Sequence, residues 1–195
     1  MKKSILATIT IATVLAGCAT NNYQQMSAGS GIQQSTLEEN CKLINCSYDK
    51  LKDNVQAAAN DIQVGMLLLS GNETRTIQYT WVSGWNEVSV DVFFINNLYS
   101  EWSFVDRAEI YVDKEMVATV SGQVDRRVGS YNEVARKHEK IEQITGSISI
   151  EAAEKIAKAN YENVTIRFYG KGGYQDKVLP RKHNLIHVVN LAKSA

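Results

Sequence analysis

Hydrophobic and polar residues alternate along most of the second half of the chain, with the period of a half-buried β-strand. The clearest run is 88–94, where four apolar residues alternate with mostly polar ones. A continuous apolar run over 64–69 is short enough to be a buried strand, and the charged stretch 129–147 is interpreted as a mobile or edge hairpin. Similar alternation predicts further strands over 74–82, 102–112, 116–120, 122–128, 164–168 and 173–179.

Apolar residues spaced by three and four positions, as in a helix, occur near both ends of the sequence. The apolar positions of 36–44 predict one helix and those of 51–62 predict a second, with a turn between them. A short helix over 151–159 is expected to be capped by Ser149, and 185–192 has helical spacing again. Together the elements predict an α+β fold with an antiparallel, sandwich-like or bent β-sheet core, N-terminal helices, one short internal helix and a C-terminal helix.

The N-terminal residues follow a different pattern, in which two lysines precede an uncharged apolar run from Ile5 to Leu15. As a helix, a run of this length covers roughly 16 Å, about half of the hydrocarbon thickness, so it is too short to span a bilayer. The pattern predicts a cleaved secretory signal peptide over 1–17. Its last residues, Leu15-Ala16-Gly17, together with Cys18 resemble the lipobox of bacterial lipoproteins. The resemblance implies thioether lipidation of Cys18 and acylation of the new amino terminus, with palmitate as the expected chain.

The residue after Cys18 bears on the destination of such a lipoprotein. In Gram-negative bacteria an Asp at this position resembles an inner-membrane retention signal, whereas this chain has Ala19. The resemblance therefore implies an outer-membrane anchor with the domain in the periplasm. Basic and acidic residues number 21 each, and loss of the two signal-peptide lysines leaves the mature chain slightly acidic. This balance gives no electrostatic footprint for nucleic acid or an anionic membrane, so attachment is expected through the lipid.

The rest of the chain divides into two segments. Residues 18–35 are small and polar and show no periodicity, so we expect a lipidated, flexible tether there. Residues 36–195 are expected to form a single globular α+β domain, because this length is comfortable for one domain and tight for two. A chain of this size buries about 70% of its unfolded surface, so it needs no metal to hold a core.

The lipobox resemblance also bears on how the three cysteines are paired. If the lipid occupies Cys18, Cys41 and Cys46 remain as a pair in an oxidising compartment, and we expect a disulfide between them. On a continuous helix they would lie about 140° apart, so a bond requires the chain to turn between them. Two free thiols are one alternative. A redox-active pair is another, disfavoured because the spacing is not Cys-x-x-Cys.

The sequence contains no pattern typical of a catalytic centre. It has no Gly-x-Ser-x-Gly nucleophile elbow, and the run 170–173 (Gly-Lys-Gly-Gly) lacks the spacing of a phosphate loop and is interpreted as a hairpin turn. His183 and His187 would share one side of a helix, but a zinc site needs a further ligand, so we interpret them as surface histidines. We expect no enzymatic activity, no metal and no cofactor.

Three tryptophans are the best candidates for a binding surface. Trp81 and Trp85 flank the turn at Ser83-Gly84, with Trp102 downstream. They could form an exposed platform for sugar, peptide or a protein partner, or they could fill the core, as large aromatic residues usually do. A local excess of basic residues is interpreted as a solvated face: Arg126, Arg127, Arg136, Lys137 and Lys140.

These observations favour a non-catalytic lipoprotein that acts by contact with another envelope protein. The expectation rests on the implied lipid anchor, the β-rich domain and the lack of a catalytic pattern. The main alternative is a small-molecule or glycan-binding module that uses Trp81, Trp85 and Trp102. Inhibition of a hydrolase is a third reading, which no inhibitory loop motif supports.

Overall fold

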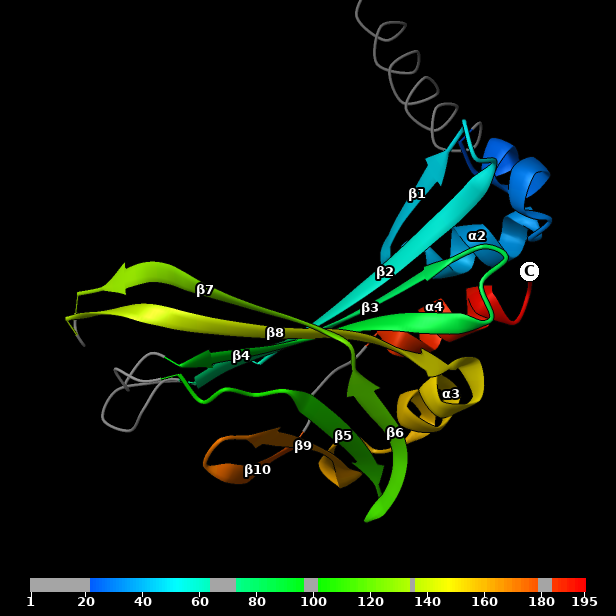
Figure 1. Cartoon of the computed structure of the whole chain (residues 1–195). Coiled ribbons are helices and arrows are strands. Elements are labelled where there is room, and N and C mark those ends of the chain that lie inside the picture. Colours follow the sequence, from blue (N-terminus) through cyan, green and yellow to red (C-terminus); the bar gives the residue numbers. More distant parts are fainter. Residues whose placement is uncertain (1–21, 64–72, 97–101, 134–135, 179–183) are drawn as a thin grey trace, which may run out of the picture.

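Two antiparallel sheets and flanking helices make up the described part of the protein. The computed structural model describes residues 22–63, 73–96, 102–133, 136–178 and 184–195 (Figure 1). Within these residues the fold is α+β with a bent, sandwich-like sheet core, which confirms the predicted fold class. The signal peptide, Cys18 and the predicted strand over 64–69 lie outside the described residues.

The larger sheet has six strands and the smaller sheet has four. The larger has the order β1 (Asn45–Asp49), β2 (Asn54–Gln63), β3 (Glu73–Val82), β4 (Glu87–Asn96), β8 (Lys137–Ser149) and β7 (Gln123–Asn132). The smaller has the order β10 (Gly173–Val178), β9 (Val164–Gly170), β5 (Arg107–Val112) and β6 (Glu115–Ser121). The helical elements are residues 22–30, α2 (Gln34–Asn40), α3 (Ile150–Lys158), the 3₁₀ helix η1 (Tyr161–Asn163) and α4 (Leu185–Ala192).

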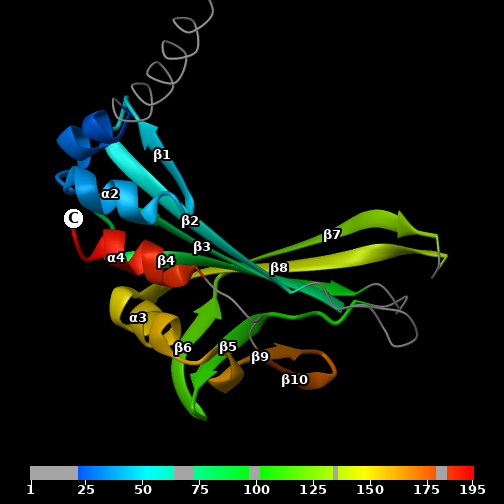
Figure 2. The ribbon, with the colours of Figure 1, turned by 180° about the vertical axis from the view of Figure 1, so that it is seen from behind.

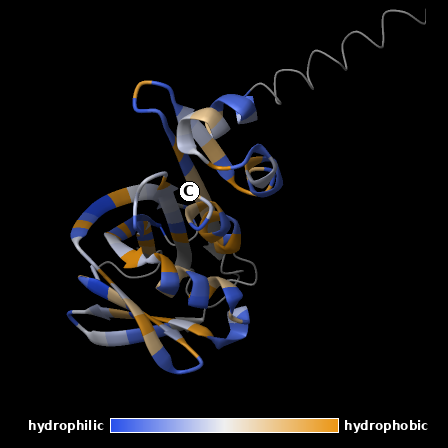
Figure 3. Cartoon of the chain, turned by 90° about the vertical axis from the view of Figure 1, so that its right-hand side faces the viewer, coloured by the Kyte–Doolittle hydropathy of each residue, from blue (hydrophilic) through white to orange (hydrophobic). Residues whose placement is uncertain are grey.

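The strand pattern of the sequence corresponds to the two faces of the larger sheet. On β4 the apolar set Val88, Val90, Val92 and Phe94 is buried, while Ser89 and its polar neighbours point to the other face. Hydrophobic and hydrophilic residues therefore alternate along the strands in Figure 3. Because successive side chains of a strand point to opposite faces, one face of the sheet is apolar and needs a cover.

Helices and the smaller sheet provide that cover. Helix α4 packs on β2 and β3, and α3 packs on β4, β6 and β8, beside one half of the larger sheet (Figure 2). The smaller sheet lies beside the other half, where the rings of Phe94 and Phe168 meet with their centroids 5.5 Å apart. As predicted, the Ser149 hydroxyl caps α3 by accepting a hydrogen bond from the Ala152 backbone N–H.

Strands β7 and β8 form a hairpin that contains the one predicted for 129–147 and also takes in the predicted strand over 122–128. Strand β8 pairs with β4 as far as Lys140, and the hairpin continues beyond that point to the pair Asn132 and Lys137 (Figure 1). Strand β7 is the last strand of its sheet. The outer part of the hairpin carries two exposed hydrophobic residues, Val128 and Tyr131.

The predicted second helix over 51–62 is wrong, because this segment contains β2. Val55, Ala57 and Ala59 are buried on one face of β2. Because three alanines stand in a row in this segment, its apolar positions match the period of a helix as well as that of a strand. The strand is selected by antiparallel pairing with β1 on one side and β3 on the other.

The predicted tether over 18–35 is wrong for residues 22–35. Residues 22–30 are helical, and Met26 and Ile32 belong to the core with exposed fractions of 1% and 0%. These two apolar residues are isolated among polar neighbours, so no periodicity marked the segment as folded. Residues 18–21 lie outside the described part of the chain.

A disulfide joins Cys41 to Cys46, as predicted. Cys41 is the C-cap residue of α2 and Cys46 lies in β1, so the bond joins a helix to a strand. The predicted helix–turn–helix corner is therefore wrong, although the chain does turn between the two cysteines.

Replacing both cysteines, in the variant Cys41→Ser/Cys46→Ser, is expected to lower the free energy of unfolding. The bond closes a short loop, for which the chain-entropy model gives about 2 kcal/mol. Urea denaturation measures the loss, and a reductant should affect the unmodified chain similarly while leaving the variant unchanged. Equal stability of variant and parent would show that the bond adds nothing.

Candidate functional site

The three tryptophans do not form a common surface, and of the two alternatives the core one holds for Trp81. Trp81 is fully buried, and its Nε1–H donates to the backbone oxygen of Trp85 over 2.9 Å. Trp85 lies in the β3–β4 turn with 51% of its surface exposed. Trp102 is half-buried and follows the other end of β4. Trp81 lies on the same inward face of β3 as Ile77 and Tyr79, which explains its burial.

The structure does not test the histidine pair, because only one of the two residues is described. His183 lies outside the described residues, and the His187 ring Nδ1 is 3.0 Å from the Asn40 side-chain oxygen. In the described segments, no group of three or more His, Cys, Asp or Glu residues is placed to hold a metal ion.

The run 170–173 is a hairpin turn, as predicted. Gly170 pairs with Gly173 across the β9–β10 hairpin, and Lys171-Gly172 forms the connection. Gly173 has a positive φ of 101°, which glycine adopts without strain. A Cβ at Gly170 would collide with the backbone oxygen of Ser103, so this glycine lets the turn approach segment 102–106.

Segment 102–106 is held by a buried carboxylate that sequence reasoning missed. Glu142, 1% exposed, accepts hydrogen bonds from the backbone N–H groups of Ser103 (2.7 Å), Phe104 (3.1 Å) and Val105 (2.7 Å). Because these N–H groups bond to a side chain, the predicted strand over 102–112 begins only at β5. Its burial could have been inferred from the sequence, because Glu142 lies on the same face of β8 as the buried Ile144 and Ile148.

Arg126 also contacts the buried carboxylate of Glu142. Its Nε lies 3.2 Å from a Glu142 carboxylate oxygen, and its guanidinium also donates to the backbone oxygen of Val105 over 2.8 Å. Arg126 is exposed, in line with its interpretation as part of a solvated face, but its guanidinium also reaches inward to Glu142 and Val105. Its positive charge compensates the negative charge of the buried Glu142 carboxylate, in addition to the three backbone N–H donors.

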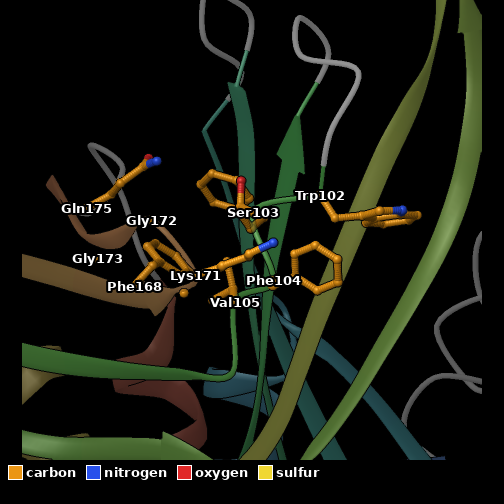
Figure 4. A pocket seen from close by; sticks show the side chains of 11 residues that line it. Trp102, Ser103, Phe104, Val105, Phe168, Lys171, Gly172, Gly173 and Gln175 are labelled. Carbon is orange, nitrogen blue, oxygen red and sulfur yellow. The ribbon is translucent and has the colours of Figure 1, made fainter.

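A cleft of about 390 Å³ opens between the ends of the two sheets (Figure 4). Phe94 of the larger sheet and Phe168 of the smaller sheet are part of its lining, and segment 102–105 and the β9–β10 turn form the walls. In Figure 4 the Lys171 amine lies between the rings of Phe168 and Phe104, and the indole of Trp102 points away from them.

Cations lie over the aromatic rings at this cleft. The Phe104 ring has the Arg126 guanidinium 5.4 Å and the Lys171 amine 5.7 Å from its centroid. The Lys140 amine lies 5.2 Å from the centroid of Trp102. These distances are within the range of cation–π attraction, so positively charged side chains and aromatic rings lie together at the cleft.

A second candidate surface is the outward face of the smaller sheet, here called the tyrosine–arginine face. Strand register places Arg107 opposite Tyr169 and Glu109 opposite Arg167. The face consists of Arg107, Glu109, Tyr111, Arg167, Tyr169, Tyr174 and Asp176. Sequence reasoning missed it because its members come from three strands whose register decides their proximity.

Stacking and ion pairing order this face. Arg167 forms two hydrogen bonds with the Asp176 carboxylate, at 2.6 and 2.7 Å, and its guanidinium lies 4.2 Å from the centroid of the Tyr174 ring. The hydrogen bonds from Arg167 hold the pKa of Asp176 below its usual value. The Arg107 guanidinium lies 3.9 Å from the centroid of Tyr169.

Glu109 joins two tyrosines of this face. It accepts hydrogen bonds from the hydroxyls of Tyr111 (2.6 Å) and Tyr169 (2.8 Å). These bonds, the one from Tyr111 first, lower the pKa of Glu109, and the bond to Glu109 raises the pKa of Tyr111 to about 12. Glu109 therefore stays ionised near neutral pH and holds both tyrosine hydroxyls in place.

The raised pKa of Tyr111 can be tested by replacing its acceptor. In Glu109→Gln the pKa of Tyr111 should fall from about 12 towards 10.0, as followed by NMR of the tyrosine ring carbons. In the unmodified chain this hydrogen bond contributes stability below pH 10 and loses it as the pH rises towards 12.

The matched control is Glu162→Gln, which removes another glutamate that accepts from a tyrosine, Tyr161. This change should leave the Tyr111 pKa where it is. A Tyr111 pKa unaffected by Glu109→Gln would contradict the hydrogen bond.

Comparisons give no independent assignment of function. No protein-family model, no curated protein and no solved structure matches this chain. None of the described helices is both long enough and apolar enough to cross a membrane.

Proposed function

We propose that this chain is an outer-membrane lipoprotein, anchored through Cys18, whose periplasmic domain is non-catalytic and acts by contact with another envelope protein. The tyrosine–arginine face is the observation that carries this proposal. Tyr and Arg are the residue types enriched at protein interfaces and at their energetic hot spots. Three tyrosines and two arginines share one outward sheet face here.

The face is also ordered before any partner arrives. Arg167 is fixed by Asp176 and by the ring of Tyr174, and Glu109 fixes Tyr111 and Tyr169. Side chains that are already ordered lose less conformational entropy on association, which favours affinity. Tyr174, with 60% of its surface exposed, and Arg107, with 48% of its side chain exposed, remain accessible to a partner.

The position of the first helix supports this use of the face. Helical structure is already present at Asn22, and the four steps from Cys18 to Asn22 span at most roughly 14 Å. A lipid on Cys18 would therefore hold residues 22–30 close to the bilayer. The smaller sheet lies at the other end of the domain (Figure 1), where it could meet a partner away from the membrane.

Site-specific photo-crosslinking in cells tests the contact. A photoreactive amino acid at position 174 is expected to give a discrete adduct with one envelope protein. The same amino acid at Lys155, which is exposed on α3, should not give this adduct. Equal adducts at both positions, or none at position 174, would contradict contact through this face.

Membrane fractionation tests the anchor separately. The unmodified chain is expected in the outer-membrane fraction, and Cys18→Ala should lose that location. Recovery of the unmodified chain in the inner membrane would contradict the sorting inferred from Ala19. The adduct at position 174 can also be followed in Cys18→Ala. If it is lost in cells but forms again when the purified domain and its partner are mixed, the loss reflects localisation and not contact.

The alternative based on three tryptophans has lost its structural basis. Trp81 is buried, and Trp85 and Trp102 lie towards opposite ends of β4. A glycan platform built from all three is therefore not proposed. Trp102 alone borders the cleft between the sheets.

A further inference from the structure

The cleft between the sheets has an apolar floor made from core residues. Phe94 and Phe168 come from different sheets and are 1% and 2% exposed, and their ring centroids are 5.5 Å apart. Phe104 stands beside them with 43% of its surface exposed. A flat apolar group that entered the cleft would therefore extend the aromatic packing already present between the sheets.

The wall beside this floor is fixed in position. Glu142 holds the backbone of Ser103, Phe104 and Val105, and Arg126 donates to the Val105 oxygen. The backbone N–H of Lys171 donates to the Ser103 oxygen over 3.1 Å, which joins the β9–β10 turn to the same wall. A ligand would therefore meet a largely preformed site.

The charge at the mouth has one sign. Lys171 is the charged residue among those that line the cleft in the described structure, and Arg126 lies close behind the Phe104 ring. The nearby carboxylate, Glu142, is buried and bonded to three backbone N–H groups and Arg126, so it does not face an incoming ligand.

From this arrangement we propose that the cleft binds a small amphipathic anion: an aromatic ring system that carries one carboxylate. The ring lies against Phe94, Phe104 and Phe168, and the carboxylate pairs with the Lys171 amine. This site is separate from the tyrosine–arginine face, which lies on the opposite side of the smaller sheet.

The same contacts discriminate between ligand classes. A cationic ligand would be repelled by Lys171 and Arg126. A neutral ligand of the same shape keeps the aromatic contacts and loses the charge-assisted hydrogen bond. The preference for an anion over its neutral isostere is therefore the quantity that identifies the site.

The test uses the full chain in lipid nanodiscs of uncharged lipid, with empty nanodiscs as the blank. Equilibrium dialysis compares 2-naphthoate with 2-naphthamide, its neutral isostere, and with 2-naphthylmethylammonium. We expect 2-naphthoate to bind about tenfold more tightly than 2-naphthamide, the ratio that a charge-assisted hydrogen bond typically supplies. The ammonium compound should bind more weakly still.

Two substitutions assign the binding to the cleft. Lys171→Gln should weaken the binding of 2-naphthoate by about tenfold and leave that of 2-naphthamide unchanged, because a polar side chain remains while the positive charge is lost. Phe104→Asn should weaken both compounds similarly. Phe104 has a φ of 53°, which Asn adopts more readily than most residues, so this change removes the ring without adding backbone strain.

The matched control is Lys155→Gln, the same change at an exposed site on α3, which should alter neither affinity. Urea denaturation of each variant checks that it is folded. The proposal is overturned if the nanodisc-corrected binding of 2-naphthoate is absent, if it equals that of 2-naphthamide, or if Lys171→Gln weakens both compounds alike.

Discussion

Glu142→Gln is expected to lower the free energy of unfolding by about 3 kcal/mol, the low end of the range for breaking a buried ion pair. The amide keeps the shape of the side chain but has a single acceptor oxygen for the N–H groups of Ser103, Phe104 and Val105. Its NH₂ group would face N–H donors instead of accepting from them. The low end applies because the Arg126 side chain is 31% exposed, so water can solvate its unpaired charge.

Urea denaturation measures this loss, and hydrogen exchange locates it. Protection of the amides of Ser103, Phe104 and Val105 should fall more than protection of the amides of β2. The matched control is Glu87→Gln, at an exposed glutamate on β4 that accepts from Ser147. That change should cost within about 0.5 kcal/mol, as is usual for surface sites. Similar losses in both variants would mean that Glu142 does not organise the segment.

Arg126 should matter less than Glu142 in the same experiment. Arg126→Gln leaves the carboxylate with its three backbone donors, so the buried charge stays hydrogen-bonded. Glu142→Gln leaves those donors without enough acceptors, and unsatisfied buried donors lower the free energy of unfolding more. Glu142 is therefore the residue that holds the backbone of 103–105, which precedes β5 and forms a wall of the cleft.

Strands with β-branched and aromatic residues on one face could be predicted from the sequence. The alternations in β4 and β9 place Val90 and Ile166 inward without ambiguity. Strand β2 could not be recognised, because Ala57 and Ala59 fit either period and the choice depends on pairing with β1 and β3. The segment 22–35 was missed because Met26 and Ile32 are isolated among polar residues.

The candidate sites were less predictable than the fold. The tyrosine–arginine face depends on register between strands far apart in sequence, such as Glu109 opposite Arg167. The position of Glu142 was readable from the alternation of β8, but a carboxylate on an inward position was taken for part of a charged, solvated hairpin. Alternation along β3 places Trp81 on the same face as Ile77, so its burial follows from the strand pattern alone.

Trp81→Ala should therefore be among the most destabilising substitutions, with a loss of about 4 kcal/mol typical of removing a buried tryptophan. Trp85→Ala should cost about 0.5 kcal/mol or less, as at other surface sites. The indole of Trp81 donates to the backbone oxygen of Trp85, which the alanine at position 85 retains, so the hydrogen bond survives that change. Urea denaturation of the two variants gives the comparison directly.

The two tryptophans are a matched pair, since the same substitution is made four residues apart at a buried and an exposed ring. Equal costs, or a larger cost at Trp85, would contradict the burial of Trp81. The result also governs how binding studies are interpreted. Because Trp81 packs in the core, loss of an adduct or ligand in Trp81→Ala reports on folding, whereas the same loss in Trp85→Ala would report on the surface of the β3–β4 turn.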